Sequence, residues 1–152
     1  MNYDKRKVSY ELYGKMMDDL VSKIKTYGND FDYVFGKPRG AWPIITHLSH
    51  QLQIPIWYAV NGINESVVSN TVRISEVKIL PEGSNLLIAD DICDHGYTFD
   101  GIKKEADGLG LNTFFVCLFK KPIAKFDPDI YIEETTQWIV FPWERYDEEP
   151  NR

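Results

Sequence analysis

Apolar residues in the first third of the chain alternate between helical spacing and short continuous runs. Between residues 10 and 24 they recur every three or four positions, which predicts a helix, and Gly28 predicts its end. Tyr33–Phe35 and Ile54–Val60 are short apolar runs, which are typical of buried strands. A second helical pattern, from Ile44 to Leu52, lies between them. This part of the chain therefore predicts the order helix, strand, helix, strand.

The same alternation returns after a polar, irregular stretch at residues 61–83, which we expect to form a hairpin or a mobile flap. Asn85–Ala89 predicts a central strand, Ile102–Leu109 a third helix, and Thr113–Phe119 a further buried strand. Strands that alternate with helices favour an α/β fold with a doubly wound, mainly parallel sheet covered on both faces. We expect one domain over residues 1–152, with ligands bound at the carboxyl ends of the strands.

Composition narrows the class of protein. No apolar run approaches the roughly 20 residues that span a bilayer, and residues 1–7 are polar and charged, unlike a signal peptide. We therefore expect a cytoplasmic protein without a membrane partner. The net charge of −6 argues against a nucleic-acid partner, so local groups must meet any anionic ligand. Cys93 and Cys117 lie in apolar contexts, and we expect both to be reduced.

Most of the candidate chemistry lies between Leu86 and Thr98. Four apolar residues are followed by two adjacent acids, then a third acid, a glycine and a threonine, before a helical pattern begins. The pattern predicts a buried strand that stops at a polar loop opening a helix. Backbone N–H groups at such a helix start suit a phosphate, and the acids suit sugar hydroxyls or hydrated Mg²⁺. The alternative, a strand followed by an acidic helix cap, explains one acid but not three acids in five positions.

This stretch resembles the phosphoribosyl pyrophosphate (PRPP) motif of type I phosphoribosyltransferases. That motif is a hydrophobic strand, two acids, two apolar residues and then Asp-Thr-Gly-x-Thr, and a histidine stands here in place of its first threonine. The resemblance implies Mg²⁺ as a cofactor, held with the ribose hydroxyls by Asp90 and Asp91. It further implies a PRPP-binding loop formed by Asp94, His95, Gly96, Tyr97 and Thr98.

A second motif, Gly36–Pro43, follows the strand at Tyr33–Phe35 and opens the second helix. It resembles the family's pyrophosphate loop, with alanine in place of the second glycine. Backbone donors together with Lys37, Arg39 and Gly40 would surround the leaving pyrophosphate. Family members often carry a strained or cis peptide just before this arginine, and here that bond joins Pro38 to Arg39. By itself, a basic loop rich in glycine and proline could equally be an ordinary turn.

A third motif, Trp138–Glu144, follows Lys121 by about one hairpin. It resembles the base-binding hood of the xanthine–guanine phosphoribosyltransferases, here over residues 121–145. The resemblance implies that Trp138 stacks on a purine, that Ile139 contacts the base and that Lys121 meets its 6-oxo oxygen. The alternative makes the tryptophans core anchors, and we prefer that interpretation for Trp143 but stacking for Trp138.

Together the resemblances imply transfer of phosphoribose from PRPP to a 6-oxopurine (guanine, xanthine or hypoxanthine), with release of pyrophosphate, in purine salvage. Asp94 would act near N7 of the base as general base. The substrates would be small molecules, and family members usually form homodimers or homotetramers. Two alternatives stay open: a phosphoribosyltransferase for another base, and a non-catalytic regulator that senses PRPP or a nucleotide.

Overall fold

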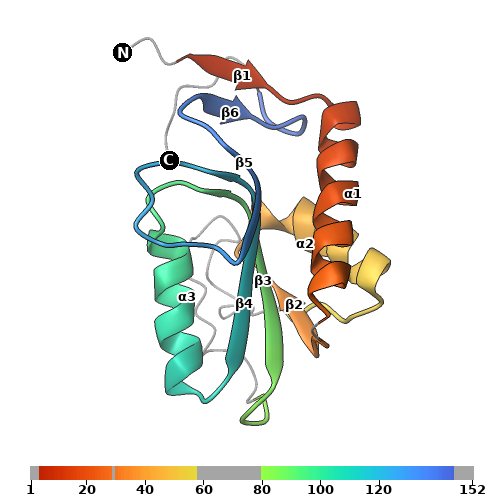
Figure 1. The fold of residues 1–152 in the computed structure, drawn as a ribbon, viewed down its shortest axis with the longest axis vertical. Coiled ribbons are helices and arrows are strands. Elements are labelled where there is room, and N and C mark those ends of the chain that lie inside the picture. Colours follow the sequence, from red (N-terminus) through yellow and green to blue (C-terminus); the bar gives the residue numbers. More distant parts are fainter. Residues whose placement is uncertain (1–3, 29, 58–79, 146–152) are drawn as a thin grey trace, which may run out of the picture.

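A computed structural model describes residues 4–28, 30–57 and 80–145 of the chain (Figure 1). The first half holds β1 (Lys5–Lys7), α1 (Tyr10–Tyr27), β2 (Tyr33–Phe35) and α2 (Ala41–Leu52). The second half holds β3 (Asn85–Cys93), α3 (Tyr97–Gly108), β4 (Asn112–Lys120), β5 (Ile130–Glu134) and β6 (Trp138–Val140).

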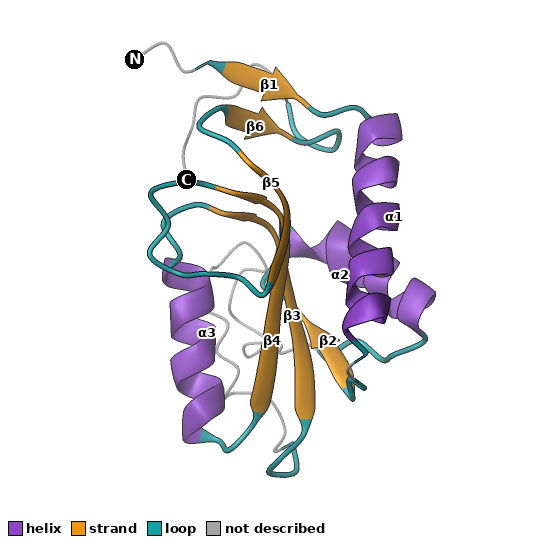
Figure 2. Ribbon diagram, in the orientation of Figure 1, coloured by secondary structure: helices purple, strands orange, loops and turns teal. Residues whose placement is uncertain are grey.

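The main sheet has the strand order β2-β3-β4-β5, and every neighbouring pair is parallel. Helices α1 and α2 lie against one face and α3 against the other (Figures 1 and 2). Each face has its own apolar core, with Met17, Leu20 and Ile44 in the first and Phe99 and Ile102 in the second. The prediction of a doubly wound parallel sheet covered on both faces is confirmed.

Local sequence explains the boundaries of α1. The hydroxyl of Ser9 accepts a hydrogen bond from the Leu12 N–H at 3.1 Å, as an N-cap does. Gly28 ends the helix with φ of +78°, a conformation that glycine adopts at little cost. The buried side chains of α1 recur on one stripe, which faces the sheet.

The strand predicted at 54–60 is described only as far as Trp57. Over that part the chain makes a single parallel bridge, between Ile56 and Val34 of β2. Residues 58–79 lie outside the described residues, and with them nearly all of the stretch at 61–83 for which a hairpin or flap is predicted.

Strand β3 is longer than predicted. The sequence suggested that it stops at the paired acids, but it continues to Cys93 because β4 pairs with it over its whole length. The register runs from Asn85 opposite Asn112 to Cys93 opposite Lys120. Backbone pairing does not depend on side-chain polarity, so the two acids lie within the strand rather than after it.

A second, two-stranded parallel sheet joins β1 to β6, with Arg6 opposite Ile139. The charged residues of β1 gave no strand signal. Arg6 bonds to the Glu133 carboxylate of β5, and its guanidinium lies 5.7 Å from the centre of the Phe119 ring. Strand β5 lies in the interval between Lys121 and the third motif, and it runs parallel to β4.

No helix among the described residues is both long enough and apolar enough to cross a bilayer.

Candidate active site

The paired acids of β3 are held by backbone hydrogen bonds. An oxygen of Asp90 accepts the N–H of Asp91 at 2.8 Å, and an oxygen of Asp91 accepts the N–H of Ile92 at 2.8 Å. Asp91 is only 5% exposed, whereas Asp90 is half-buried. Neighbouring residues of a strand point to opposite faces, so the two carboxylates diverge rather than converge on one point.

Asp91 brings the first two motifs together. A Cβ atom on Gly40 would lie 2.5 Å from one carboxylate oxygen of Asp91. The backbone φ of Gly40 is −59°, which any residue can adopt, so glycine is needed here for space and not for conformation. The loop that opens α2 therefore lies directly against the buried carboxylate at the end of β3.

The same loop packs closely at its start. A Cβ on Gly36 would lie 2.6 Å from the backbone oxygen of Ala89 and 2.7 Å from Cβ of Ala41. The peptide bond between Pro38 and Arg39 is cis, as the resemblance implies. Lys37 is half-buried and Arg39 is exposed, so the basic groups lie at the surface of this loop.

Helix α3 begins at Tyr97, shortly after the third acid, and its N-cap is Gly96, with φ of +92° and no capping side chain. The first N–H groups of a helix have no partner within it, and they attract anions. The alternative in which an acid caps this helix is not what the structure shows. Tyr97 and Thr98, in the first turn, are exposed.

Asp94 lies between the strand and this helix, with its side chain 37% exposed. One of its oxygens is 3.9 Å from Nδ1 of His95. The His95 ring stacks on Tyr97, with 5.6 Å between ring centres and 6° between planes. The histidine that departs from the family motif therefore forms an aromatic pair with Tyr97 beside the third acid.

The hood meets this region through Lys121. Its backbone N–H donates to the carbonyl of Cys93 at 2.9 Å, and its ammonium donates to the carbonyl of Gln137. Trp138, the next residue, is half-buried. The Ile139 side chain is 2% exposed and lies in the first core, so its side chain cannot meet a base and only its backbone could.

Trp143 is a core anchor, as preferred from the sequence. Its ring stacks on Phe141 at 5.1 Å with 4° between planes, and it meets Tyr13 edge-on at 5.1 Å. Stacking of Trp138 on a base stays a prediction, because no ligand is present.

A family model for the phosphoribosyl transferase domain matches residues 7–149. The chain belongs to the phosphoribosyl transferase domain family. That membership agrees with the resemblance drawn from the three motifs.

Two xanthine-guanine phosphoribosyltransferases are similar to part of the chain. The protein from Cereibacter sphaeroides is 29% identical over 77 residues, which are 49% of this chain and 44% of that protein. The protein from Gluconobacter oxydans is 35% identical over 65 residues, which are 41% of this chain and 36% of that protein. The matched region thus spans less than half the length of these curated relatives.

Solved structures resemble the chain over nearly its whole length. The purine phosphoribosyltransferase from Pyrococcus horikoshii is 27% identical, with a TM-score of 0.78, over 98% of this chain and 99% of that chain. A hypothetical protein from Neisseria gonorrhoeae with bound ppGpp has a TM-score of 0.75 over 97% and 93% of the two chains. It is 22% identical, so that likeness shows the shared fold.

The loop at 121–127 packs against the predicted PRPP-binding loop, and no pattern in the sequence indicated this contact. A Cβ on Gly96 would lie 2.7 Å from Cβ of Phe126, and the Lys125 N–H donates to the His95 carbonyl at 3.1 Å. Phe126 is anchored in turn against Phe99 and Phe115. These contacts join residues about 30 positions apart, so no local pattern could have indicated them.

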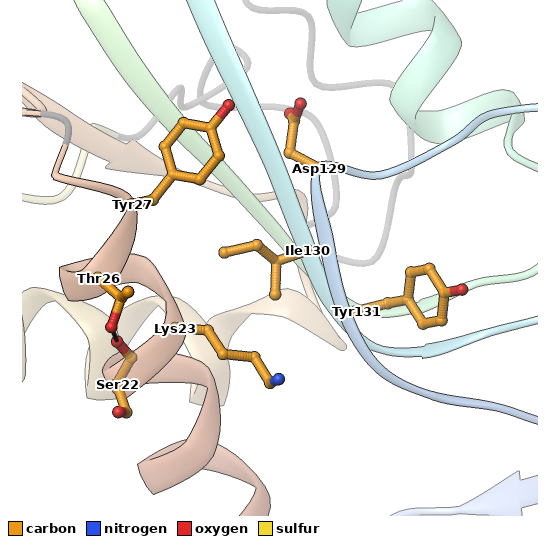
Figure 3. Close-up of a pocket in the computed structure, with 7 residues that line it drawn as sticks. All are labelled: Ser22, Lys23, Thr26, Tyr27, Asp129, Ile130 and Tyr131. Atoms are coloured by element: carbon orange, nitrogen blue, oxygen red, sulfur yellow. Dashed lines mark hydrogen bonds between the residues drawn. The ribbon is translucent and has the colours of Figure 1, made fainter.

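A cavity of about 460 Å³ lies away from these motifs, between α1 and β5 (Figure 3). It is lined by Ser22, Lys23, Thr26, Tyr27, Asp129, Ile130 and Tyr131. The Tyr27 ring contacts Phe114 near the start of β4, with 4.5 Å between ring centres. The cavity therefore lies toward the amino ends of the strands, and none of the predicted site residues lines it.

Both cysteines are buried free thiols, as expected. Burial, followed by the charge of Asp90, raises the pKa of Cys93 to about 11. Burial also raises the pKa of Cys117 well above its ordinary value. Neither thiol is therefore a nucleophile at neutral pH.

Gly40→Ala should disturb the contact between the two motifs. Its methyl group must displace the Asp91 carboxylate from the Ile92 N–H or push the loop outward, which should cost about 1–3 kcal/mol of stability. Chemical denaturation would measure this, and calorimetry should show weaker PRPP binding. Gly101→Ala is the matched control, because open space surrounds that helical glycine and alanine should stabilise α3 slightly. Equal effects of both substitutions would contradict the packing argument.

The thiols should resist modification in the folded protein. A raised pKa keeps a thiol protonated until higher pH, so Cys93 should react slowly with a disulfide reagent at pH 8 and faster as the pH approaches 11. Unfolding in denaturant should release both thiols at pH 8. Rapid labelling of native protein at pH 8 would show that the thiols are neither buried nor protonated.

Proposed function

We propose that this protein transfers the 5-phosphoribosyl group from PRPP to a 6-oxopurine base and releases pyrophosphate. The observation that carries the proposal is the contact of Gly40 with the buried Asp91 carboxylate, which joins the two motifs at the carboxyl ends of β2 and β3. Ligands of open parallel sheets bind at such strand ends. Membership of the family and the full-length likeness to the Pyrococcus purine enzyme support the same activity.

Two loops would bind different parts of PRPP. The N–H groups at the start of α3 would bind the 5′-phosphate, with the Thr98 hydroxyl as a further donor. Lys37 and Arg39 would neutralise the leaving pyrophosphate. Such local donors are required because the chain as a whole carries a charge of −6 and repels an anionic substrate.

The residues also fit a role for Mg²⁺. This ion keeps several waters and takes one or two carboxylates together with substrate oxygens. Among the described residues there is no group of three or more His, Cys, Asp or Glu that could hold a metal by itself, so substrate oxygens would have to supply the other ligands. Asp90 and Asp91 point to opposite faces, and Asp91 is buried. The half-buried Asp90 would therefore be the better direct ligand. Mg²⁺ would supply charge neutralisation on the phosphates.

Asp94 is our candidate for the general base. It is partly exposed at the start of α3, and since Gly96 is the N-cap, the carboxylate is not committed to capping the helix. A carboxylate there could take the proton that a purine loses as its nitrogen attacks C1 of PRPP. The base itself would lie between Trp138 and the Lys121 ammonium, on the hood side of the same loop.

A panel of bases with PRPP and Mg²⁺, followed by pyrophosphate release, tests the proposal. Guanine, xanthine or hypoxanthine should support turnover, whereas adenine and orotate should not. Asp94→Asn should lower turnover by roughly 10²–10⁴-fold with little loss of PRPP affinity, because the phosphate is held mainly by backbone groups. Near wild-type turnover by the variant on every purine would contradict the role of Asp94.

Substitutions in the hood should weaken binding of the base without weakening binding of PRPP. Trp138→Ala should weaken purine binding by an amount typical of lost base stacking, roughly 1–3 kcal/mol, and leave PRPP binding nearly unchanged. Lys121→Met should raise the KM for 6-oxopurines and leave the KM for PRPP nearly unchanged. The hood assignment would be wrong if both variants raised the KM for PRPP and left the KM for the base unchanged.

A nucleotide-sensing role is the second candidate function. The hypothetical protein from Neisseria gonorrhoeae, which shares this fold, was solved with ppGpp bound, and this supports the nucleotide-sensing alternative. A sensor would bind nucleotide but release no pyrophosphate with any base in the panel. The same assay therefore distinguishes the two functions.

A further inference from the structure

One peptide unit of the hood is held from both sides. The carbonyl of Gln137 accepts a hydrogen bond from the Lys121 ammonium, and the N–H of Trp138 donates to the Asp4 carbonyl at 2.9 Å. These two groups belong to the same planar peptide, so they point in opposite directions. Lys121 lies on one side of this peptide and Asp4 on the other.

A side-chain bond reinforces the Asp4 side. The Gln137 amide donates to the Asp4 carboxylate at 2.9 Å, while the Gln137 N–H donates to the Thr135 hydroxyl at 3.1 Å. Both the backbone and the side chain of Gln137 are thereby tied to neighbouring segments. We call Asp4, Gln137 and Lys121 the hood clasp.

The hood clasp is bonded to the end of β3, next to the predicted catalytic acid. The Lys121 N–H donates to the carbonyl of Cys93, which immediately precedes Asp94. A short chain of contacts thus connects Asp4, near the beginning of the sequence, with the end of β3. Lys121 and Trp138, the two predicted base contacts, both lie along it.

The Asp4 carboxylate is not required to form the hood sheet. Three register pairs join β1 to β6, and the Val8 N–H also donates to the Val140 carbonyl at 2.9 Å. The side chains of Val8, Ile139 and Val140 are buried. Asp4 is exposed, so loss of its carboxylate removes one hydrogen bond and leaves this apolar anchoring in place.

We propose that Asp4 is a positioning residue for base recognition, which acts through Gln137 to fix the Lys121 ammonium and the Trp138 ring. This inference rests on the proposed function. It assigns a share of base specificity to the N-terminal segment, although that segment is far in sequence from the hood. Asp4 would act through the Gln137–Trp138 peptide, because the N–H of this peptide is hydrogen-bonded to Asp4 and its carbonyl to Lys121.

The test compares Asp4→Ala, Gln137→Ala and the double variant in steady-state assays with PRPP and the preferred purine. Each single substitution should raise the KM for the base roughly three- to tenfold, as for the loss of one hydrogen bond, and leave the KM for PRPP unchanged. The double variant should match the single variants, because both remove the same bond. Asp4→Asn keeps an acceptor for the Gln137 amide and should restore the wild-type KM.

Lys7→Ala is the matched control, since Lys7 is exposed on the same strand, and it should change neither KM. Melting temperatures of all variants should stay close to that of the wild type. Three outcomes would overturn the inference: equal changes in both KM values, additive effects in the double variant, or no rescue by asparagine. In each of these cases, turnover by the wild-type protein would still uphold the proposed function. A wild-type protein that neither turns over nor binds any purine would overturn both.

Discussion

The pairing of β3 with β4 over their full length is the constraint on which the rest of the structure depends. It carries the paired acids inside the sheet, with Asp90 opposite Cys117, and brings Cys93 and Lys120 to the same level. The loops that follow the two strands therefore begin side by side, and the Lys121 N–H reaches the Cys93 carbonyl. The candidate phosphate loop and the beginning of the hood are neighbours for this reason.

Glycines make the close contacts around this strand end possible, for two different physical reasons. Gly40 has an ordinary backbone conformation but no room for a side chain beside Asp91. Gly96 combines a positive φ with a close approach to Phe126. The positive φ of Gly96 is a local property of the chain, whereas the close approaches at Gly40 and Gly96 exist only because distant segments meet.

The hood is assembled from both ends of the described chain. Strand β1 lies beside β6 and pairs with it (Figure 1). Arg6 connects this small sheet to β5 and to the Phe119 ring. The hood sheet and the main sheet are therefore coupled through a side chain that none of the three motifs contains. This arrangement explains why a charged N-terminal segment without a strand pattern has a defined place in the fold.

The sequence by itself determined the alternation of helices and strands, the parallel sheet and the location of the candidate loops. Those features follow from apolar periodicity and from short motifs, which are local properties of the chain. It did not determine the length of β3, the strand β1, or the burial of the Ile139 side chain in the core. These depend on backbone pairing and on packing between segments up to 133 positions apart, as between Asp4 and Gln137. Hydrogen bonds across such separations leave no pattern in the local sequence, so only the tertiary structure could decide them.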